Sequence, residues 1–347
     1  MKFTKLLILL IFCVLPTRTE AQSNSQILTF EFEGNTIHGQ VITPANESKG
    51  MVLVVQGSGC YAAVEERHYY DVREMLVNSG YSTYIWDKTG CGQSEGTFDY
   101  NRTIQNSADE VKAAIDELKK YEIPGSDAVG LWGVSRAGWI NPVVINQYPG
   151  IKFWITVSGV DAKENFGYLF EQNLRIEGLP EDSVQLYVEE WREGNRVTHS
   201  GAPLEDYLAV TPHLQHNKFL KRFNTGELTE EGYIAFQKVF MEQNFDVEDG
   251  TAIIVDDFDT ILSQVDVPVL ALFGELDMNV DWRKTAALYR ETLNSNGHLT
   301  IESFPGCNHN MFKANTGGFY EFQDYDMPWD RCDGFLESMS NWLSELE

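Results

Sequence analysis

Residues 128–139 read Ala128-Val-Gly-Leu-Trp-Gly133-Val-Ser135-Arg-Ala137-Gly138-Trp139, and this stretch decides the fold. The apolar run at its start predicts a buried β-strand, and the residues after Ser135 predict a helix. A serine on a sharp turn between strand and helix exposes its hydroxyl and leaves the next backbone N–H free to bind an oxyanion. The small residues Gly133, Ala137 and Gly138 permit the crowding of such a turn. Ser135 is therefore the candidate nucleophile.

A second serine, Ser94, lies between glycines in Gly92-Gln93-Ser94-Glu95-Gly96, so the short motif alone leaves two candidates. The residues around Ser94 are polar and rich in glycine, which is typical of a loop. Only Ser135 has the strand before it and the helix after it, and it is preferred for that reason. Pro142 falls inside the helix after Ser135 and predicts a kink there.

The chain is acidic. Its 347 residues include 26 Lys and Arg against 52 Asp and Glu, giving a formal net charge of −26. Such a surface repels phosphate backbones, so we expect no nucleic-acid partner. The charge is consistent with a bias against anionic substrates, but it also serves simply to keep the protein soluble.

The N-terminus has the pattern of a secretory signal peptide. Lys2 and Lys5 precede the apolar run 6–15, and Thr19-Glu20-Ala21 fits a cleavage site. A run of ten residues is short of the roughly 20 that span a bilayer, and no later segment is apolar enough to do so. We therefore expect residues 1–21 to be a signal peptide cleaved near Ala21, and the mature protein to be exported, periplasmic or secreted, without a membrane span.

Four cysteines remain after the expected signal peptide: Cys60, Cys91, Cys307 and Cys332. In an oxidising compartment they allow three pairings, which sequence cannot distinguish. Our working hypothesis pairs Cys60 with Cys91 and Cys307 with Cys332. Their spacing does not resemble that of a zinc site, and no metal is expected.

Short apolar runs alternate with helical patterns along much of the chain. Strands are expected at 26–32, 36–43, 51–56, 81–86, 127–132, 152–157, 267–273 and 298–304, and helices at 68–78 and 104–121. This alternation predicts an α/β fold with a mostly parallel sheet covered on both faces.

The alternation stops after Ser158-Gly159, and about a hundred residues pass before the next convincing strand. Apolar residues recur there at helical spacing, and helix starts are expected at Pro180 and at Thr229. We interpret residues 161–260 as a helical cap inserted into a core formed by 22–160 and 261–347. Apolar faces of the cap either line a substrate pocket or simply pack the cap.

A nucleophilic serine needs a histidine to take its proton and a carboxylate to orient the histidine. Asp277 follows the strand 267–273, and His309 follows the strand 298–304. Asp277 has competitors, because Glu275 or Asp161 could be the acid and Asp277 could cap a helix near Trp282. His309 is preferred over the other histidines, which lie near strands, at a helix start or in the cap: His38, His68, His199, His213, His216 and His298.

Several motifs together resemble those of the α/β-hydrolase superfamily, and in particular its exported bacterial esterases and serine-aminopeptidase-like (S33-type) members. They are Gln56-Gly-Ser58-Gly59, Asp87-Lys-Thr-Gly-Cys-Gly-Gln-Ser-Glu-Gly96, Gly133-Val-Ser135-Arg-Ala-Gly138-Trp-Ile-Asn-Pro142, Gly274-Glu-Leu-Asp277 and Pro305-Gly-Cys-Asn-His309. The resemblance runs from about Ile27 to the C-terminus. It implies an eight-stranded, mostly parallel sheet, and the order Ser135, Asp277, His309 is the order of that fold.

The resemblance also implies catalysis without metal or cofactor, with the backbone N–H groups of Ser58 and Arg136 as oxyanion donors. Two positions depart from the usual pattern. Gln56 replaces a histidine and changes how the oxyanion loop is braced, and Ala137 replaces a glycine and adds a methyl group to a tight turn.

We therefore expect an exported serine hydrolase that cleaves a small-molecule carboxylic ester through an acyl-enzyme. An aminopeptidase or amidase with the same triad is the first alternative, with Glu171, Glu177 and Glu189 as carboxylates that could hold a substrate ammonium. A binding protein on a hydrolase shell is the second. The acyl and alcohol groups and the oligomeric state stay open.

Overall fold

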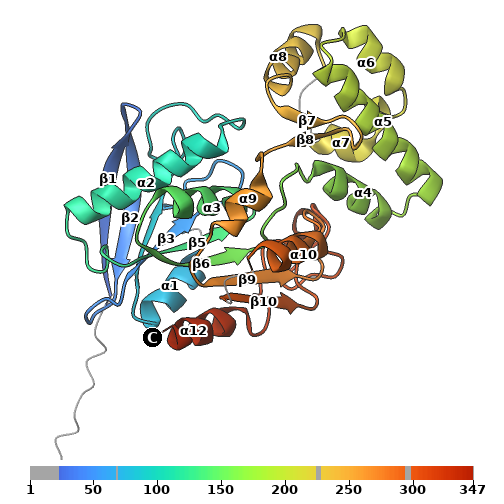
Figure 1. Ribbon diagram of the computed structural model, residues 1–347. Helices are drawn as coiled ribbons and strands as arrows, with labels where there is room; N and C mark the ends of the chain where they lie inside the picture. The colour runs from blue at the N-terminus through green and yellow to red at the C-terminus, as the bar shows by residue number, and fades with distance from the viewer. Residues whose placement is uncertain (1–22, 68, 224–227, 294–297, 347) are drawn as a thin grey trace, which may run out of the picture.

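The computed structural model describes residues 23–67, 69–223, 228–293 and 298–346. Its main element is an eight-stranded sheet with the order β1-β2-β4-β3-β5-β6-β9-β10 (Figure 1). The first two pairings, β1 with β2 and β2 with β4, are antiparallel, and all others are parallel. The strands are β1 Asn24–Phe32, β2 Asn35–Thr43, β3 Met51–Val55, β4 Ser82–Trp86, β5 Val129–Val134, β6 Ile151–Val157, β9 Val269–Gly274 and β10 Leu299–Phe304.

Helices cover both faces of this sheet, because its central strands are apolar on both sides. One face packs against α2 Ile104–Lys120, α3 Ala137–Gln147, α9 Phe258–Ser263 and α10 Trp282–Thr292. The other packs against α1 Tyr70–Asn78 and α12 Phe335–Glu345. The short helix α11 Glu321–Asp324 precedes α12. The predicted fold class is confirmed, since all-apolar strands such as β3 must be shielded on both sides.

A group of helices lies apart from the sheet and follows β6 in the chain (Figure 1). It has a small apolar core of its own, centred on Phe170, Val188 and Phe219. Its elements are α4 Phe166–Ile176, α5 Glu181–His199, α6 Leu204–Val210, η1 Leu214–His216, α7 Lys218–Phe223 and α8 Glu230–Phe240. Helix α5 begins directly after Pro180, and the Thr229 hydroxyl caps α8 by accepting from the Gly232 N–H, as the sequence predicted.

The segment 161–260 also contains a hairpin of two three-residue strands, β7 Asn244–Asp246 and β8 Thr251–Ile253, which the sequence did not predict. Strands of that length are too short to show a two-residue periodicity. The predicted boundary at residue 260 falls inside α9, whose Phe258 and Leu262 belong to the apolar core beside the sheet.

Two further sequence expectations concern the helices α1 and α3. The expected helix 68–78 is observed as α1 from Tyr70, and His68 lies outside the described residues, as does the expected signal peptide. Helix α3 runs through Pro142 as one helix, and the kink at that proline stays a prediction.

Candidate active site

Ser135 lies on the turn between β5 and α3, at the carboxyl end of a central strand of the sheet. Its φ of 54° is in the left-handed region, which is uncommon for a residue with a side chain and recurs at functional sites. The Ser135 N–H donates to the Val157 carbonyl over 3.0 Å, and the Ser135 carbonyl accepts from the Gly138 N–H over 2.7 Å. The backbone on both sides of the serine is therefore fixed, which is the geometry of a nucleophile elbow.

The small residues around Ser135 are needed because α3 lies very close to β5 and to the segment after β6. A Cβ atom at Gly133 would lie 2.6 Å from the Ala137 Cβ, and one at Gly138 would lie 3.1 Å from the Val160 backbone nitrogen. Ala137 is fully buried, so its extra methyl group is accommodated against Gly133. A larger residue at Gly133 would push α3 away from the sheet and change the turn.

His309 and Asp277 form a buried pair at the same edge of the sheet. The His309 Nδ1 lies 2.8 Å from the Asp277 Oδ2, and both residues are less than a tenth exposed. The other carboxylate oxygen of Asp277 accepts from the backbone N–H groups of Asn279 and Val280, each over 2.9 Å. Because both oxygens are occupied, the carboxylate is fixed in the orientation that holds the imidazole ring.

The loop that carries His309 is tied to the strand beside the nucleophile. Ser158, directly after β6, donates its hydroxyl to the His309 carbonyl over 2.7 Å, while its neighbour Val157 accepts from the Ser135 N–H. Ser135 and His309 are thus brought to one edge through β6. Their side chains form no hydrogen bond with each other within the described chain, and such bonds in unliganded enzymes often close only with substrate.

Ser58 and Arg136, the residues expected to supply the oxyanion donors, border one cavity of about 190 Å³. The loop before Ser58 runs close to the nucleophile, because a Cβ atom at Gly57 would lie 3.2 Å from the Ser135 Cβ. The cavity is also bordered by Lys88, Arg102 and Glu110. Burial lowers the pKa of Arg136 and lowers the pKa of Lys88 to about 8.

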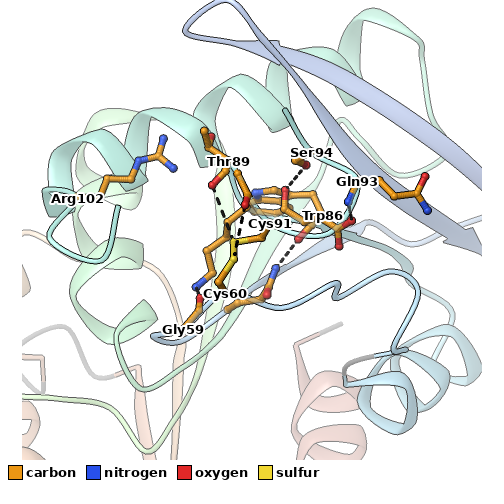
Figure 2. The surroundings of a disulfide bond; sticks show 12 residues. Gly59, Cys60, Trp86, Thr89, Cys91, Gln93, Ser94 and Arg102 are labelled. Atoms are coloured by element: carbon orange, nitrogen blue, oxygen red, sulfur yellow. Dashed lines mark hydrogen bonds between the residues drawn. A yellow bond between two sulfur atoms is a disulfide. The ribbon is translucent and has the colours of Figure 1, made fainter. Parts of the chain in front are cut away.

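Two disulfides hold the loops of this site. Cys60 is bonded to Cys91, which links the loop after β3 to the loop after β4 (Figure 2). Cys307 is bonded to Cys332, which links the histidine loop to the segment before α12. The pairing hypothesis is confirmed, and each disulfide lies within two residues of a residue predicted for the site.

The alternative candidates for the nucleophile and the acid make other contacts in the structure. The Ser94 hydroxyl donates to the Asp87 carbonyl over 2.6 Å and accepts from the His38 N–H, so it braces a loop. Glu275 accepts from the Ser303 hydroxyl, and Asp161 pairs with Lys284 over 2.6 Å. The helix cap near Trp282 is Asp281, which accepts from the N–H groups of the next turn.

The other histidines that the structure describes make other contacts: His38 lies 3.3 Å from Asp87, and the His199 Nε2 lies 3.1 Å from the Gln243 carbonyl oxygen. His213 pairs with Glu190 over 2.5 Å in the helical segment, and within the described residues no group of histidines, cysteines and carboxylates is arranged to hold a metal.

Three neighbours of the site were not found from the sequence: Ser158, Tyr168 and Lys88. The Tyr168 hydroxyl donates to the Asp277 carbonyl over 3.3 Å, and burial raises the Tyr168 pKa to about 12. Lys88 donates to the carbonyls of the loop after β3. Ser158 and Lys88 come one and two residues after a strand, and that position at the carboxyl edge was the available signal.

This fold and this site define a serine hydrolase of the α/β-hydrolase type. The expected superfamily is confirmed: the model of the X-Pro dipeptidyl-peptidase (S15) family matches residues 33–304, and the chain belongs to that family. The narrower S33-type resemblance stays a prediction. A comparison with curated proteins gave no match.

Solved structures of the same fold include enzymes with different activities. An esterase of Pyrococcus furiosus has a TM-score of 0.53 at 14% identity, over 93% of each chain. A proline iminopeptidase of Mycobacterium smegmatis has a TM-score of 0.54 at 16% identity, over 92% of this chain and 98% of the other. Est1E of Butyrivibrio proteoclasticus, with ferulic acid bound, has a TM-score of 0.50 at 17% identity, over 92% and 96%. At such identities the likeness shows the fold alone.

Proposed function

We propose that this protein is an exported serine hydrolase that cleaves carboxylic esters of small molecules. The observation that carries the proposal is the buried contact between His309 and Asp277, at the sheet edge where Ser135 occupies a strained elbow. A histidine held in this way can act as the base for a serine hydroxyl.

The proposed reaction has two steps. The Ser135 oxygen attacks the ester carbonyl while His309 takes the hydroxyl proton, and Asp277 stabilises the imidazolium that forms. The N–H groups of Ser58 and Arg136 stabilise the oxyanion. His309 then returns the proton to the leaving alcohol, and water hydrolyses the acyl-enzyme by the same route.

The helical segment 161–260 serves in this proposal as a cap over the site. The contact between the Tyr168 hydroxyl and the Asp277 carbonyl supports this role, because it joins the first cap helix to the loop of the acid. The apolar faces of the cap helices suit an uncharged ester better than a charged substrate.

An aminopeptidase is the second candidate, and membership of a dipeptidyl-peptidase family favours it. Such an enzyme needs an available carboxylate to hold the substrate ammonium. Glu171 is paired with Arg175 over 2.7 Å, and Glu189 lies 3.4 Å from Arg196. Glu177 is paired with neither of these arginines, and it is therefore the one of the three carboxylates that is left for the substrate ammonium.

Export is part of the same proposal. Its supports are the signal-like residues 1–21 and the two disulfides, which persist in oxidising compartments. Among the described residues no helix has both the length and the apolar character to cross a membrane.

The test uses the mature chain, beginning at Gln22, with a fluorophosphonate probe and two matched substrate panels. We expect labelling at Ser135 and faster turnover of short-chain aryl esters than of aminoacyl arylamides. Preferred turnover of the arylamides would favour the aminopeptidase. No labelling and no turnover of either panel would contradict both and favour a non-catalytic binding protein.

A further inference from the structure

We propose that Lys88 is a positioning residue of the oxyanion hole, whose ammonium group orients and polarises the peptide between Gly57 and Ser58. This inference rests on the proposed function, because it concerns the N–H of Ser58 as an oxyanion donor. It assigns a catalytic purpose to a lysine outside the triad.

The contacts of Lys88 are made with the oxyanion loop itself. Its Nζ donates to the Gly57 carbonyl and to the Gly59 carbonyl, each over 2.6 Å. The Gly57 carbonyl and the Ser58 N–H belong to the same peptide unit. A trans peptide is planar, so its C=O and N–H point in opposite directions, and no cis bond occurs in the described chain. A carbonyl held toward Lys88 therefore directs the Ser58 N–H away from it.

The nucleophile lies against this same peptide. A Cβ atom at Gly57 would be 3.2 Å from the Ser135 Cβ and 3.1 Å from the Val134 carbonyl oxygen. Ser58 and Arg136 both line one cavity, and Arg136 directly follows Ser135 in the chain. The orientation of the peptide between Gly57 and Ser58 thus determines whether the Ser58 N–H can donate a hydrogen bond to the oxyanion.

The charge of Lys88 adds a second effect. Hydrogen bonds from an ionised donor are about twice as strong as neutral ones. A carbonyl that accepts such a bond polarises its amide, and cooperative strengthening of the N–H as a donor is roughly 10–30% per bond. Lys88 therefore makes the Ser58 N–H a better donor to a developing negative charge.

A merely structural brace does not require a partly buried ammonium group. The start of the loop is already held by a neutral group, because the Gln56 amide donates to the Trp86 carbonyl. Within the described chain Lys88 forms no ion pair. Its two hydrogen-bond acceptors are main-chain carbonyls, its Nζ lies 5.9 Å from the centre of the Phe98 ring, and the negative charge of Glu110 attracts it more weakly. A charge held partly out of water costs free energy unless its partners satisfy it, and the hydrogen-bond partners of this one are carbonyls of the oxyanion loop.

The charged surroundings set the pH range in which Lys88 can act. The other charged or titratable residues that line the same cavity are Glu110 from α2, Arg102, Tyr100 and Asp99 from the preceding loop, Arg136 from the elbow and Glu33 from the β1–β2 turn. Burial lowers the pKa of Lys88 to about 8, and the positive charge of Arg136 acts in the same direction. Above that pH the ammonium, and with it the polarising charge, is lost.

The experiment compares wild type, Lys88→Met and the exposed control Lys120→Met in the mature chain. Each is assayed for kcat and KM with an aryl ester, and for affinity toward a trifluoromethyl ketone, which adds to the serine and places an oxyanion in the hole. We expect Lys88→Met to lose about 10- to 100-fold in kcat, since removal of a whole oxyanion donor costs about 10²–10³. Affinity for the ketone should fall by the same factor, with KM changed less than about threefold.

A structural role alone would lower stability but leave ketone affinity in the folded fraction unchanged. Near wild-type kcat and ketone affinity in Lys88→Met would overturn the inference while the proposed function stands. If Lys88→Met does not fold, the test is the pH dependence of ketone affinity in the wild type. We expect the wild type to bind the ketone more weakly as the pH rises from 8 to 10, and an affinity that does not change with pH would overturn the inference. A wild type that neither turns over esters nor reacts with fluorophosphonate contradicts the proposed function itself.

Discussion

The hydroxyl of Ser158 donates to the backbone carbonyl of His309 over 2.7 Å, although 151 positions separate the two residues in sequence. Ser158 is fully buried and follows the strand next to the nucleophile strand. This bond ties the histidine loop to the end of β6, and Asp277 and the Cys307–Cys332 disulfide hold the loop from other directions.

Replacing Ser158 with alanine should therefore move His309 without removing any reacting group. We expect a fall of about tenfold in kcat with little change in KM, and a loss of about 1–2 kcal/mol in the free energy of unfolding. Ester kinetics and urea denaturation measure the two effects. Ser303→Ala is the matched control, because Ser303 is exposed and its hydroxyl bonds Glu275 and not the histidine loop. Unchanged kcat in Ser158→Ala would show that the bond does not position the histidine.

The choice between the two serines can be tested by a pair of alanine variants. Ser135→Ala should lose several orders of magnitude in turnover and all fluorophosphonate labelling, because the nucleophile is gone. Ser94→Ala should stay labelled and active, but lose about 1–2 kcal/mol of stability with its two loop contacts. Activity that survives in Ser135→Ala and disappears in Ser94→Ala would reverse the assignment.

The acid is tested by Asp277→Asn, which keeps the shape of the side chain and removes its charge. The amide should leave the His309 ring poorly oriented and its imidazolium without a counter-charge. We expect a loss of about 10³–10⁴-fold in kcat. Glu275→Gln, two positions away on the same loop, should stay within about twofold of wild type. An unaffected rate in Asp277→Asn would move the role to Glu275 or Asp161.

A buried carboxyl in the segment that joins core and cap predicts a pH effect on stability. Burial raises the pKa of Glu164 from 4.5 to about 7, with a smaller contribution from the negative charge of Asp161. Its Oε2 accepts from the Phe166 N–H over 2.6 Å, while its Oε1 is buried and has no hydrogen-bond partner among the described residues. The carboxyl is therefore neutral in the folded protein under mildly acidic conditions.

Because the folded pKa is raised, the contribution of Glu164 to stability is complete below about pH 4.5 and is lost as the pH rises through 7. Relative to Glu164→Gln, wild type should lose up to roughly 3 kcal/mol between pH 4.5 and 7.5, since one pKa unit corresponds to about 1.4 kcal/mol. Urea denaturation at both pH values measures the difference. The exposed control Glu65→Gln should show the same pH dependence of the free energy of unfolding as wild type. If Glu164→Gln also shows the wild-type pH dependence, the burial argument is contradicted.

The sheet and the elbow were predictable because their signals are local. Each parallel strand of the core is a short apolar run bounded by turn residues, and the observed strands differ from the expected ones by only a few residues. The elbow adds small residues at fixed positions around Ser135, and its positive φ follows from that turn. The helix caps at Pro180 and Thr229 were equally local.

The hairpin β7–β8 and the helix α9 show where such signals end. Three-residue strands have too few positions for a pattern, and a six-residue helix at a predicted boundary can belong to either side. Whether α9 packs on the sheet depends on contacts with α3, which lies more than a hundred residues earlier, and with α10, which follows it in the chain.

By itself, the sequence determined the α/β class, the order of serine, acid and histidine, and the residues that could fill each role, because periodicity and turn chemistry involve neighbours along the chain. Only the tertiary structure decided that Asp277 and not Glu275 holds His309, that Ser158 ties the histidine loop, and that Lys88 meets the Gly57 carbonyl. These contacts join residues 31 to 151 positions apart, and their geometry depends on strand order and loop path, which no local pattern encodes.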